Sequence, residues 1–334
     1  MQSARRASVA ALAIVAAVAT PLAGCKRKPP VAPVQEPGSP DEAEREVASL
    51  LGEAYQGVKR SNAPGMMSLL AIDVFVAGLR HGDVGLERSA ALVALGDALG
   101  ARKTHKVRST KLDVGAAIDG RSAWAVDQID VDGKPFVVVA LAAELDGLWV
   151  LTSVEVARAG IQTGEPAATP PAVWSAPSGP TAAHRPAPAD AATVLAQLAG
   201  EPELRVDYLD HYADRQSIVV RVGGKKSVLR GVKAIKKAWK KKPPVWTLGE
   251  PLASATTPDG AFAWLLVPAA LVDEAPGARR VFAVFEKFEP EVPDDGDDGG
   301  DDGGGDDDDG GDEPPAVQGL PWRLVVLHES APEP

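Results

Sequence analysis

Apolar residues at helical spacing begin about forty residues into the chain. Ser39, Pro40 and Glu42 match a capping box, with serine at the N-cap, proline at the first helical position and glutamate three residues after the serine. Apolar residues then recur every three or four positions, the spacing of one helix face: Ala43, Val47, Leu50, Leu51, Ala54 and Val58. The pattern predicts a first helix from about residue 40.

Two further helical stretches follow. A helix over about residues 86–99 should end at Gly100, because glycine is common directly after a helix. Before it, Pro64 opens a stretch that carries the apolar residues Met66, Met67, Leu69 and Leu70.

The pattern becomes strand-like between Thr104 and Val156. Asp-Gly between two strands is a strong hairpin signal, because both residues tolerate the positive φ angles of a type I′ turn. Three such pairs separate four β-rich runs: Asp119-Gly120, Asp132-Gly133 and Asp146-Gly147. We expect a four-stranded antiparallel meander, so that helices followed by a sheet form an α+β domain over residues 41–158.

The second half of the chain repeats the first at an offset of 140 residues. The ungapped shift superposes a helix face, an Asp-Gly turn and an Ala-Trp pair. The matched positions are Leu92, Leu95 and Leu99 with Val232, Ile235 and Trp239, Leu112 with Leu252, Asp119-Gly120 with Asp259-Gly260, and Ala123-Trp124 with Ala263-Trp264. We therefore predict a second domain over residues 190–334, joined to the first by a Pro/Ala-rich linker over residues 159–189.

Two segments of the second half resemble SnoaL-like domains of the nuclear transport factor 2-like superfamily. Val228–Trp239 is similar to the start of the family's third helix, and Trp322–Ser330 to its last strand, which reads Trp-Arg, apolar residues, then His-x-Ser. The resemblance covers most of residues 190–330. It is weaker over 41–157, where Leu148–Leu151 lacks the His-x-Ser ending. It implies two cone-like α+β domains, each with helices packed on a curved antiparallel sheet.

The N-terminal 24 residues have the three parts of a bacterial export signal. Arg5 and Arg6 are followed by an apolar run that is too short to span a bilayer of ~30 Å comfortably, and then by small residues before Cys25. Leu22–Cys25 resembles the lipobox of bacterial lipoproteins. This resemblance implies a diacylglycerol on the Cys25 sulfur, cleavage before Cys25 and acylation of the new N-terminus.

Lipidation of Cys25 would anchor the protein to a membrane of the bacterial cell envelope. Residues 25–40 contain five prolines and are expected to be a disordered tether. Lys26, rather than aspartate, follows the cysteine, which favours the periplasmic side of the outer membrane. Cys25 is the single cysteine of the chain, so the protein is not expected to contain disulfides.

One segment supplies the whole net charge of the mature chain. Removal of residues 1–24 leaves 33 basic and 46 acidic residues, of which 13 acidic residues lie in Glu291–Glu313. The remainder is neutral, which argues against a nucleic-acid partner. We expect residues 291–319 to be a disordered acidic insert. The stretch of this insert that ends at Glu313 does not match the pattern of a calcium-binding loop, because Asp307 occupies the position at which the loop needs a glycine.

A basic segment contrasts with this insert. Arg221–Lys242 carries ten basic residues and no acidic one, with Val232, Ile235 and Trp239 on the opposite helix face. A solvated face is the simplest interpretation, and a surface for anionic headgroups is the alternative.

Candidate site residues come from the second half. Alternation along the last strand predicts that Trp322, Leu324, Val326 and His328 share one face. His328 would then point into a pocket beside Trp264 or Tyr208, so Tyr208, Trp264, Trp322 and His328 are the candidate pocket residues. No catalytic motif, cofactor motif or metal-ligand spacing is recognisable, and we assign no catalytic, cofactor or metal residue.

Three functions stay open at this point. The first is a non-enzymatic, lipid-anchored tandem module that binds an envelope protein or a small apolar ligand. The second is an isomerase- or cyclase-type enzyme, as the resemblance allows, with its site in the second domain. The third is a spacer that presents the acidic insert. An apolar pocket with a buried acid would favour the enzyme, and a filled interior would favour the module.

Overall fold

The computed structural model describes residues 38–79, 85–158, 178–200, 202–221, 228–241, 246–271, 274–288 and 320–330. Residues Pro37–Pro334 form one compact unit. Cys25, the signal sequence, most of the predicted tether and linker, and the acidic insert therefore lie outside the described residues.

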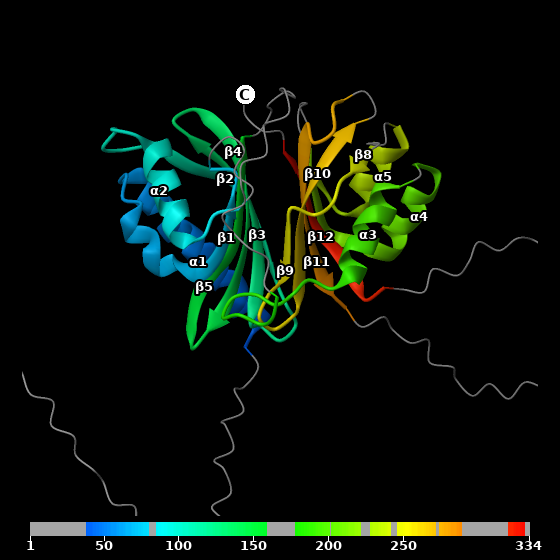
Figure 1. The fold of residues 1–334 in the computed structure, drawn as a ribbon, viewed down its shortest axis with the longest axis horizontal. Coiled ribbons are helices and arrows are strands. Elements are labelled where there is room, and N and C mark those ends of the chain that lie inside the picture. The colour runs from blue at the N-terminus through cyan, green and yellow to red at the C-terminus, as the bar shows by residue number, and fades with distance from the viewer. Residues whose placement is uncertain are drawn as a thin grey trace, which may run out of the picture. The chain divides into compact units, whose positions relative to one another are not determined.

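The first half of the compact unit contains a five-stranded sheet and the helices that cover it (Figure 1). Its elements are α1 (Pro40–Lys59), η1 (Pro64–Leu69), β1 (Leu70–Ala77), α2 (Arg88–Leu99), β2 (Val107–Ala116), β3 (Ser122–Val131), β4 (Lys134–Leu145) and β5 (Leu148–Arg158). The sheet order is β1-β5-β4-β3-β2, with β1 parallel to β5 and the other neighbours antiparallel. The predicted meander is confirmed as β2 to β5.

Two local predictions at the start of this half are wrong. The Ser39 side chain makes no capping bond. Its backbone carbonyl instead accepts the N–H groups of Glu42 and Ala43, each at 3.0 Å. The second helical stretch is the short 3-10 helix η1, and Leu70 already belongs to β1. Because β1 pairs with the distant strand β5, local periodicity does not reveal it.

Two of the three Asp-Gly turns have the predicted geometry. Asp132 and Gly133 have φ angles of 53° and 82°, and Asp146 and Gly147 have 52° and 79°. At the first turn only Gly120 has a positive φ, and its N–H donates to the Ala117 carbonyl at 2.9 Å. That turn is therefore a wider loop, in which the Asp119 carboxylate accepts the Arg121 N–H.

The second half forms a seven-stranded sheet of order β7-β6-β12-β11-β10-β8, with β9 also paired to β10. Its elements are α3 (Ala189–Ala199), α4 (Pro202–Tyr212), β6 (Ala213–Val220), β7 (Val228–Arg230), α5 (Val232–Lys241), β8 (Trp246–Leu248), β9 (Ala253–Thr256), β10 (Phe262–Leu271), β11 (Arg279–Lys287) and β12 (Trp322–Ser330). The sequence pattern does not predict α4.

The order β6-β12-β11-β10 of this sheet matches β1-β5-β4-β3 of the first, and β6 runs parallel to β12 as β1 does to β5. Both ends of β3 and β10 differ by 140 residues, the offset found in the sequence. The wide turn recurs as well, because Gly260 donates to Thr257 and Asp259 accepts the Ala261 N–H.

Each sheet has one face toward its helices and one toward the other sheet. The helix-facing cores are separate clusters, whereas a third cluster contains strand residues of both halves. Aromatic rings lie at its centre: Phe75 is 4.4 Å from Trp264 and 6.3 Å from Phe282, measured between ring centroids. Burial of both apolar faces against each other removes them from water.

Polar contacts also join the two sheets. Glu155 of β5 accepts a hydrogen bond from Ser330 of β12 at 3.1 Å, and its other carboxylate oxygen lies 2.6 Å from Nδ1 of His328. The Glu155 and His328 side chains are only 3% and 2% exposed. Nearer the solvent, Arg230 of β7 makes a two-pronged ion pair with Asp113 of β2. These pairs fix how one sheet lies on the other.

Candidate functional site

The four residues predicted for a pocket in the second half are divided between two apolar clusters. Trp322 and Tyr208 belong to the helix-facing core, where Tyr208 stacks on Tyr212 at 6.3 Å. Trp264 lies in the cluster between the sheets, and His328 contacts Glu155 across the same interface. The structure therefore does not bring these four side chains into one pocket.

The predicted alternation along the last strand fails because of a β-bulge. Leu324 pairs with Phe285 and Val326 with Val284, so Val325 is an extra residue on β12. The extra residue reverses the face of every later side chain. Trp322 and Leu324 face the helices as predicted, but Val326 faces the other sheet.

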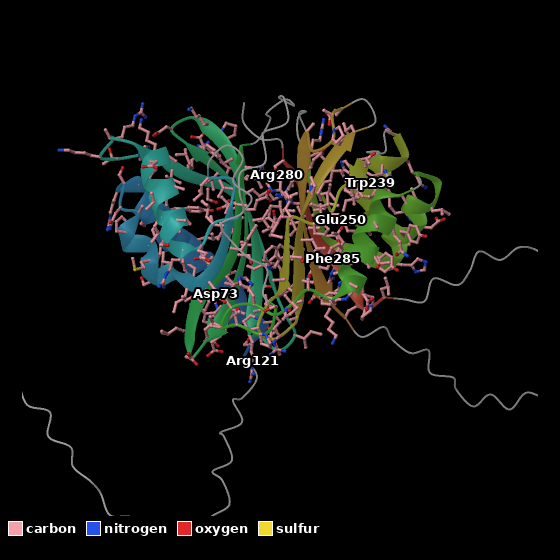
Figure 2. The ribbon with its side chains drawn as sticks, in the orientation of Figure 1. Asp73, Arg121, Trp239, Glu250, Arg280 and Phe285 are labelled. Carbon is pink, nitrogen blue, oxygen red and sulfur yellow. The ribbon has the colours of Figure 1, made fainter. Side chains whose placement is uncertain are left out.

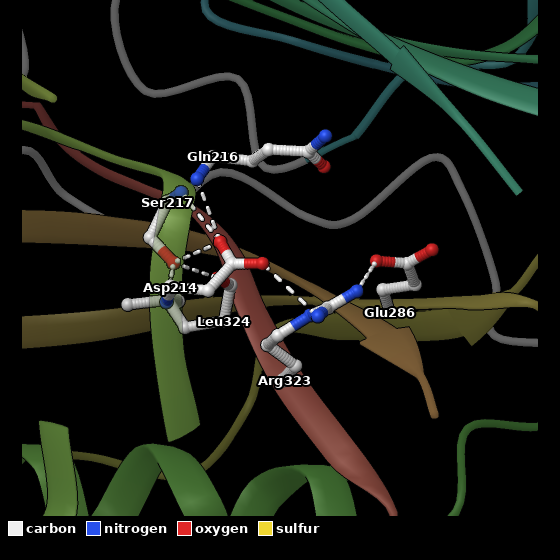
Figure 3. A network of polar contacts seen from close by, with 6 residues as sticks. All are labelled: Asp214, Gln216, Ser217, Glu286, Arg323 and Leu324. Carbon is white, nitrogen blue, oxygen red and sulfur yellow. Dashed lines mark hydrogen bonds and ion pairs between the residues drawn. The ribbon is translucent and has the colours of Figure 1, made fainter. Parts of the chain in front are cut away.

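A polar network holds the bulge in place (Figure 3). The Ser217 hydroxyl donates to the Leu324 carbonyl at 2.5 Å and so satisfies a carbonyl beside the extra residue. Arg323 pairs with Asp214 at 3.0 Å and with Glu286 at 2.6 Å, which ties together strands β6, β12 and β11. The position of His328 thus depends on contacts that are distant in sequence.

A pocket of about 230 Å³ lies in the first half, between the helices and the helix-facing side of the sheet. Among the described residues that line it, Tyr55 alone has a polar side chain. The lining comes from both helices and all five strands, and includes Leu51, Tyr55, Val58, Met66, Leu70, Leu92, Leu95, Ala98, Leu99, Val107, Ile129, Phe136, Val138 and Val156.

Side-chain size differs between the two halves at a position that lines the pocket. Leu99 lines the pocket, and the residue 140 positions later is Trp239, which is 1% exposed and packs edge-on against Trp246 at 6.0 Å. Figure 2 labels Trp239 on α5 and Phe285 on β11, both of which belong to the helix-facing core. At this position a larger, buried aromatic side chain of the second half therefore stands where the first half has a leucine that lines the pocket.

One polar group reaches the apolar pocket. The Tyr55 hydroxyl oxygen is buried, and burial, followed by the neighbouring charge of Asp127, raises the pKa of this tyrosine. Asp127 is 1% exposed on β3, and its carboxylate accepts the Ser109 hydroxyl at 2.8 Å. Tyr55 is among the described residues that line the pocket, and Asp127 is not.

The surroundings of Asp127 favour its protonated form. Burial raises the pKa of Asp127, the hydrogen bond from the Ser109 hydroxyl offsets part of the rise, and the charge of Asp113 adds to it. A carboxyl group with a raised pKa beside a tyrosine hydroxyl can hold a proton close to the pocket.

The sequence places Asp127 at a buried position of its strand, which periodicity alone does not reveal as a candidate site. Asp127 occupies the same strand face as Ala123, Ala125 and Ile129, which are buried in the helix-facing core. At the 140-residue offset, Asp127 corresponds to Val267 and Tyr55 to Leu195, both apolar and buried. A comparison of the two halves therefore identifies a polar pair that one half has and the other lacks.

Other kinds of site are not found in the described part of the chain. Its histidine, cysteine, aspartate and glutamate residues form no group of three or more that could hold a metal ion. None of its helices combines the length and apolar character needed to cross a bilayer.

Comparisons with known proteins find similarity to solved structures. No family model matches the sequence, and no curated protein matches it. An NTF2-like protein of unknown function from Pseudomonas putida is 16% identical, with a TM-score of 0.31, and the match covers 42% of this chain and 99% of that one. A putative dehydratase of the NTF2-like family from Streptomyces avermitilis is 15% identical, with a TM-score of 0.31, over 35% of this chain and 97% of the other.

A protein with a cystatin-like fold from Caulobacter vibrioides is also similar, at 16% identity and a TM-score of 0.31, over 36% of this chain and 91% of that one. Each of these three proteins is thus matched almost in full by less than half of this chain.

Ionisation of Asp127 should make folding stability depend on pH. Its pKa is raised in the folded chain, so the folded state binds the proton more tightly than the unfolded state does. Stability should therefore fall as pH rises above the unfolded pKa of about 3.9, until the raised pKa is passed. Asp127→Asn removes this titration. The stability of the variant relative to the wild type should therefore increase as the pH rises from about 4 to about 8.

Urea unfolding at about pH 4 and at about pH 8 measures the free energy of unfolding of the wild type and of Asp127→Asn. Glu53→Gln, on the exposed face of α1, is the control. A difference between Asp127→Asn and the wild type that is the same at both pH values would contradict the assigned environment of Asp127.

Proposed function

We propose that this chain is a lipid-anchored envelope protein whose first half binds a small apolar molecule without transforming it. The observation that carries the proposal is the 230 Å³ pocket, whose lining is apolar apart from Tyr55. Pockets that are apolar with a few polar groups are the usual binding sites for small molecules. The second half supports the first by covering the outer face of its sheet.

The size of the pocket limits the ligand. An engineered apolar cavity of about 150 Å³ binds benzene, whereas drug-sized ligands occupy about 300–1,000 Å³. The pocket lies between these limits, so its ligand is a molecule of one or two rings or a short acyl chain. The Tyr55 hydroxyl would hydrogen-bond to one polar atom of that ligand and fix its orientation.

The pairing of Tyr55 with Asp127 favours a second candidate, an enzyme that transfers a proton on an apolar substrate. Such an enzyme needs its acid or base within about 2.6–3.2 Å of the reacting atom. Asp127 does not line the pocket, and a bound molecule would meet the tyrosine instead. We therefore prefer binding to catalysis, and place either function in the first half.

The anchor is proposed from the sequence of residues 1–25. The charged start, the short apolar run and the cysteine after Ala23-Gly24 support lipidation of Cys25. Two or more acyl chains on one residue give stable membrane attachment, whereas a single chain is reversible. Lys26 supports a position on the periplasmic side of the outer membrane.

Obstruction of the pocket should abolish binding while leaving the fold intact. Ala98 of α2 lines the pocket and is exposed, so a large side chain there can cover the opening at little cost in stability. Ala98→Trp should weaken binding of a neutral naphthylamine dye at least about tenfold, equivalent to ~1.4 kcal/mol. Fluorescence titration measures the affinity.

Val93→Trp is the matched control, because Val93 is exposed on the same helix and does not line the pocket. Equal dye affinity of Ala98→Trp and Val93→Trp, with unchanged thermal unfolding of both, would rule out the pocket as the binding site.

Loss of the proposed lipid should release the protein from membranes. Cys25→Ser removes the sulfur that would carry the diacylglycerol, so the variant should leave the membrane fraction after an alkaline wash, whereas the wild type should stay in it. Fractionation of cells that express each form measures the distribution. If both forms remain with the membrane, Cys25 is not the anchor.

A further inference from the structure

Three exposed apolar side chains lie near one end of the first sheet. Ile118 is in the β2–β3 turn and Leu148 begins β5 directly after the β4–β5 turn. The Glu144 N–H donates to the Arg121 carbonyl at 3.0 Å, so these two turns are neighbours. Ile72 is near the start of β1, which runs parallel to β5 from the same end, with Leu70 opposite Leu151.

These side chains are unusual in their exposure. Ile118, Ile72 and Leu148 are 88%, 74% and 69% exposed, the highest values for large apolar side chains in the described part of the chain. Single exposed apolar residues are common on protein surfaces, but a group of them commonly marks a contact with another surface. We call these three residues the apolar end.

The chain continues toward Cys25 from this same end. A Cβ atom on Gly38 would lie 2.5 Å from the Gly120 carbonyl oxygen, so the first described residue packs on the turn that carries Ile118. Figure 2 labels Arg121 of this turn, next to the start of α1. Twelve residues lie between Cys25 and Gly38, which limits the distance between these two residues to ~45 Å when the segment is fully extended.

We propose that the apolar end is a membrane-contacting surface that places Ile72, Ile118 and Leu148 in the interfacial region of a lipid bilayer. In the cell this contact rests on the proposed lipidation of Cys25, because the lipid holds Gly38 close to the membrane. A short tether raises the effective concentration of the apolar end at the surface, so a weak contact is enough.

The chemistry of the apolar end indicates burial in lipid rather than attraction to charge. Asp119 and Asp146 lie in its two turns and would be repelled by anionic headgroups, and Arg121 is the single basic residue of these turns. The competing surface is α5, where Lys233, Lys237, Lys240 and Lys241 are exposed. Contact through lysines weakens at high salt, whereas apolar contact does not.

The test uses a tether that does not depend on lipidation. Residues 25–334 with Cys25→Ser carry an N-terminal hexahistidine and are attached to phosphatidylcholine vesicles that contain nickel-chelating lipid. One cysteine is then introduced by Ile118→Cys, Leu148→Cys or the control Val93→Cys, and is labelled with an environment-sensitive dye. Figure 1 shows α2, which carries Val93, away from the β4–β5 turn. Nitroxide-labelled lipid in the vesicles quenches dyes that reach the acyl chains.

We expect nitroxide lipid to reduce the fluorescence at positions 118 and 148 about twofold or more, with little change at position 93. The difference should persist in about 1 M salt, where the Debye length is ~3 Å. A dye introduced by Ile72→Cys should also be quenched, and Ile118→Asp with Leu148→Asp should remove that quenching. Circular dichroism melts confirm that each variant is folded.

Equal quenching at positions 93, 118 and 148, or none at any of them, overturns the proposal. Quenching that disappears at high salt assigns the contact to charge and also overturns it. Because the artificial tether replaces the lipid, these outcomes are independent of the Cys25→Ser fractionation, so failure of the anchor and failure of the apolar end can be told apart.

Discussion

The apolar contact between the two sheets is the interaction on which the rest of the structure depends. Phe75, Trp264 and Phe282 form its centre, with the Trp264 and Phe282 ring centroids 5.7 Å apart. Glu155 and His328 are buried within it, and each satisfies the other. Loss of either side chain would leave one buried polar atom of the other without its bond, a cost of about 1–3 kcal/mol. Since each sheet covers one face of the other, the opposite face of each sheet packs against helices, and in the first half this face also lines the pocket.

The helix-facing sides of the two halves differ in their side chains although their strands correspond. Trp239 fills in the second half the place that Leu99 leaves open in the first, and Val267 stands where the first half has Asp127. A well-packed interior binds nothing, whereas an apolar space with one hydroxyl can take a small molecule. Side-chain volume at a few equivalent positions thus distinguishes the half that we propose to bind a ligand from the other half.

Local signals in the sequence predict local structure well. The type I′ turns at Asp132-Gly133 and Asp146-Gly147 and the strands between them follow from residue preferences. Features that depend on distant partners do not follow from the pattern. β1 needs β5 as its parallel neighbour, and the bulge at Val325 needs the Ser217 hydroxyl. The bulge reverses the strand face, which is why alternation placed His328 in a pocket instead of the sheet interface. The candidate site was missed because Asp127 and Tyr55 are distant in sequence and match no motif.

Methyl-resolved NMR during titration with naphthalene tests the central claim most directly, because the leucine, isoleucine and valine methyls report on both interiors at once. The account predicts shift changes and intermolecular contacts at methyls that line the pocket, such as those of Leu92, Leu95 and Val138. Methyls of the filled interior, such as those of Leu195 and Leu198, should not change. Contacts to the second interior, or none to the first, would contradict the assignment of binding to the first half.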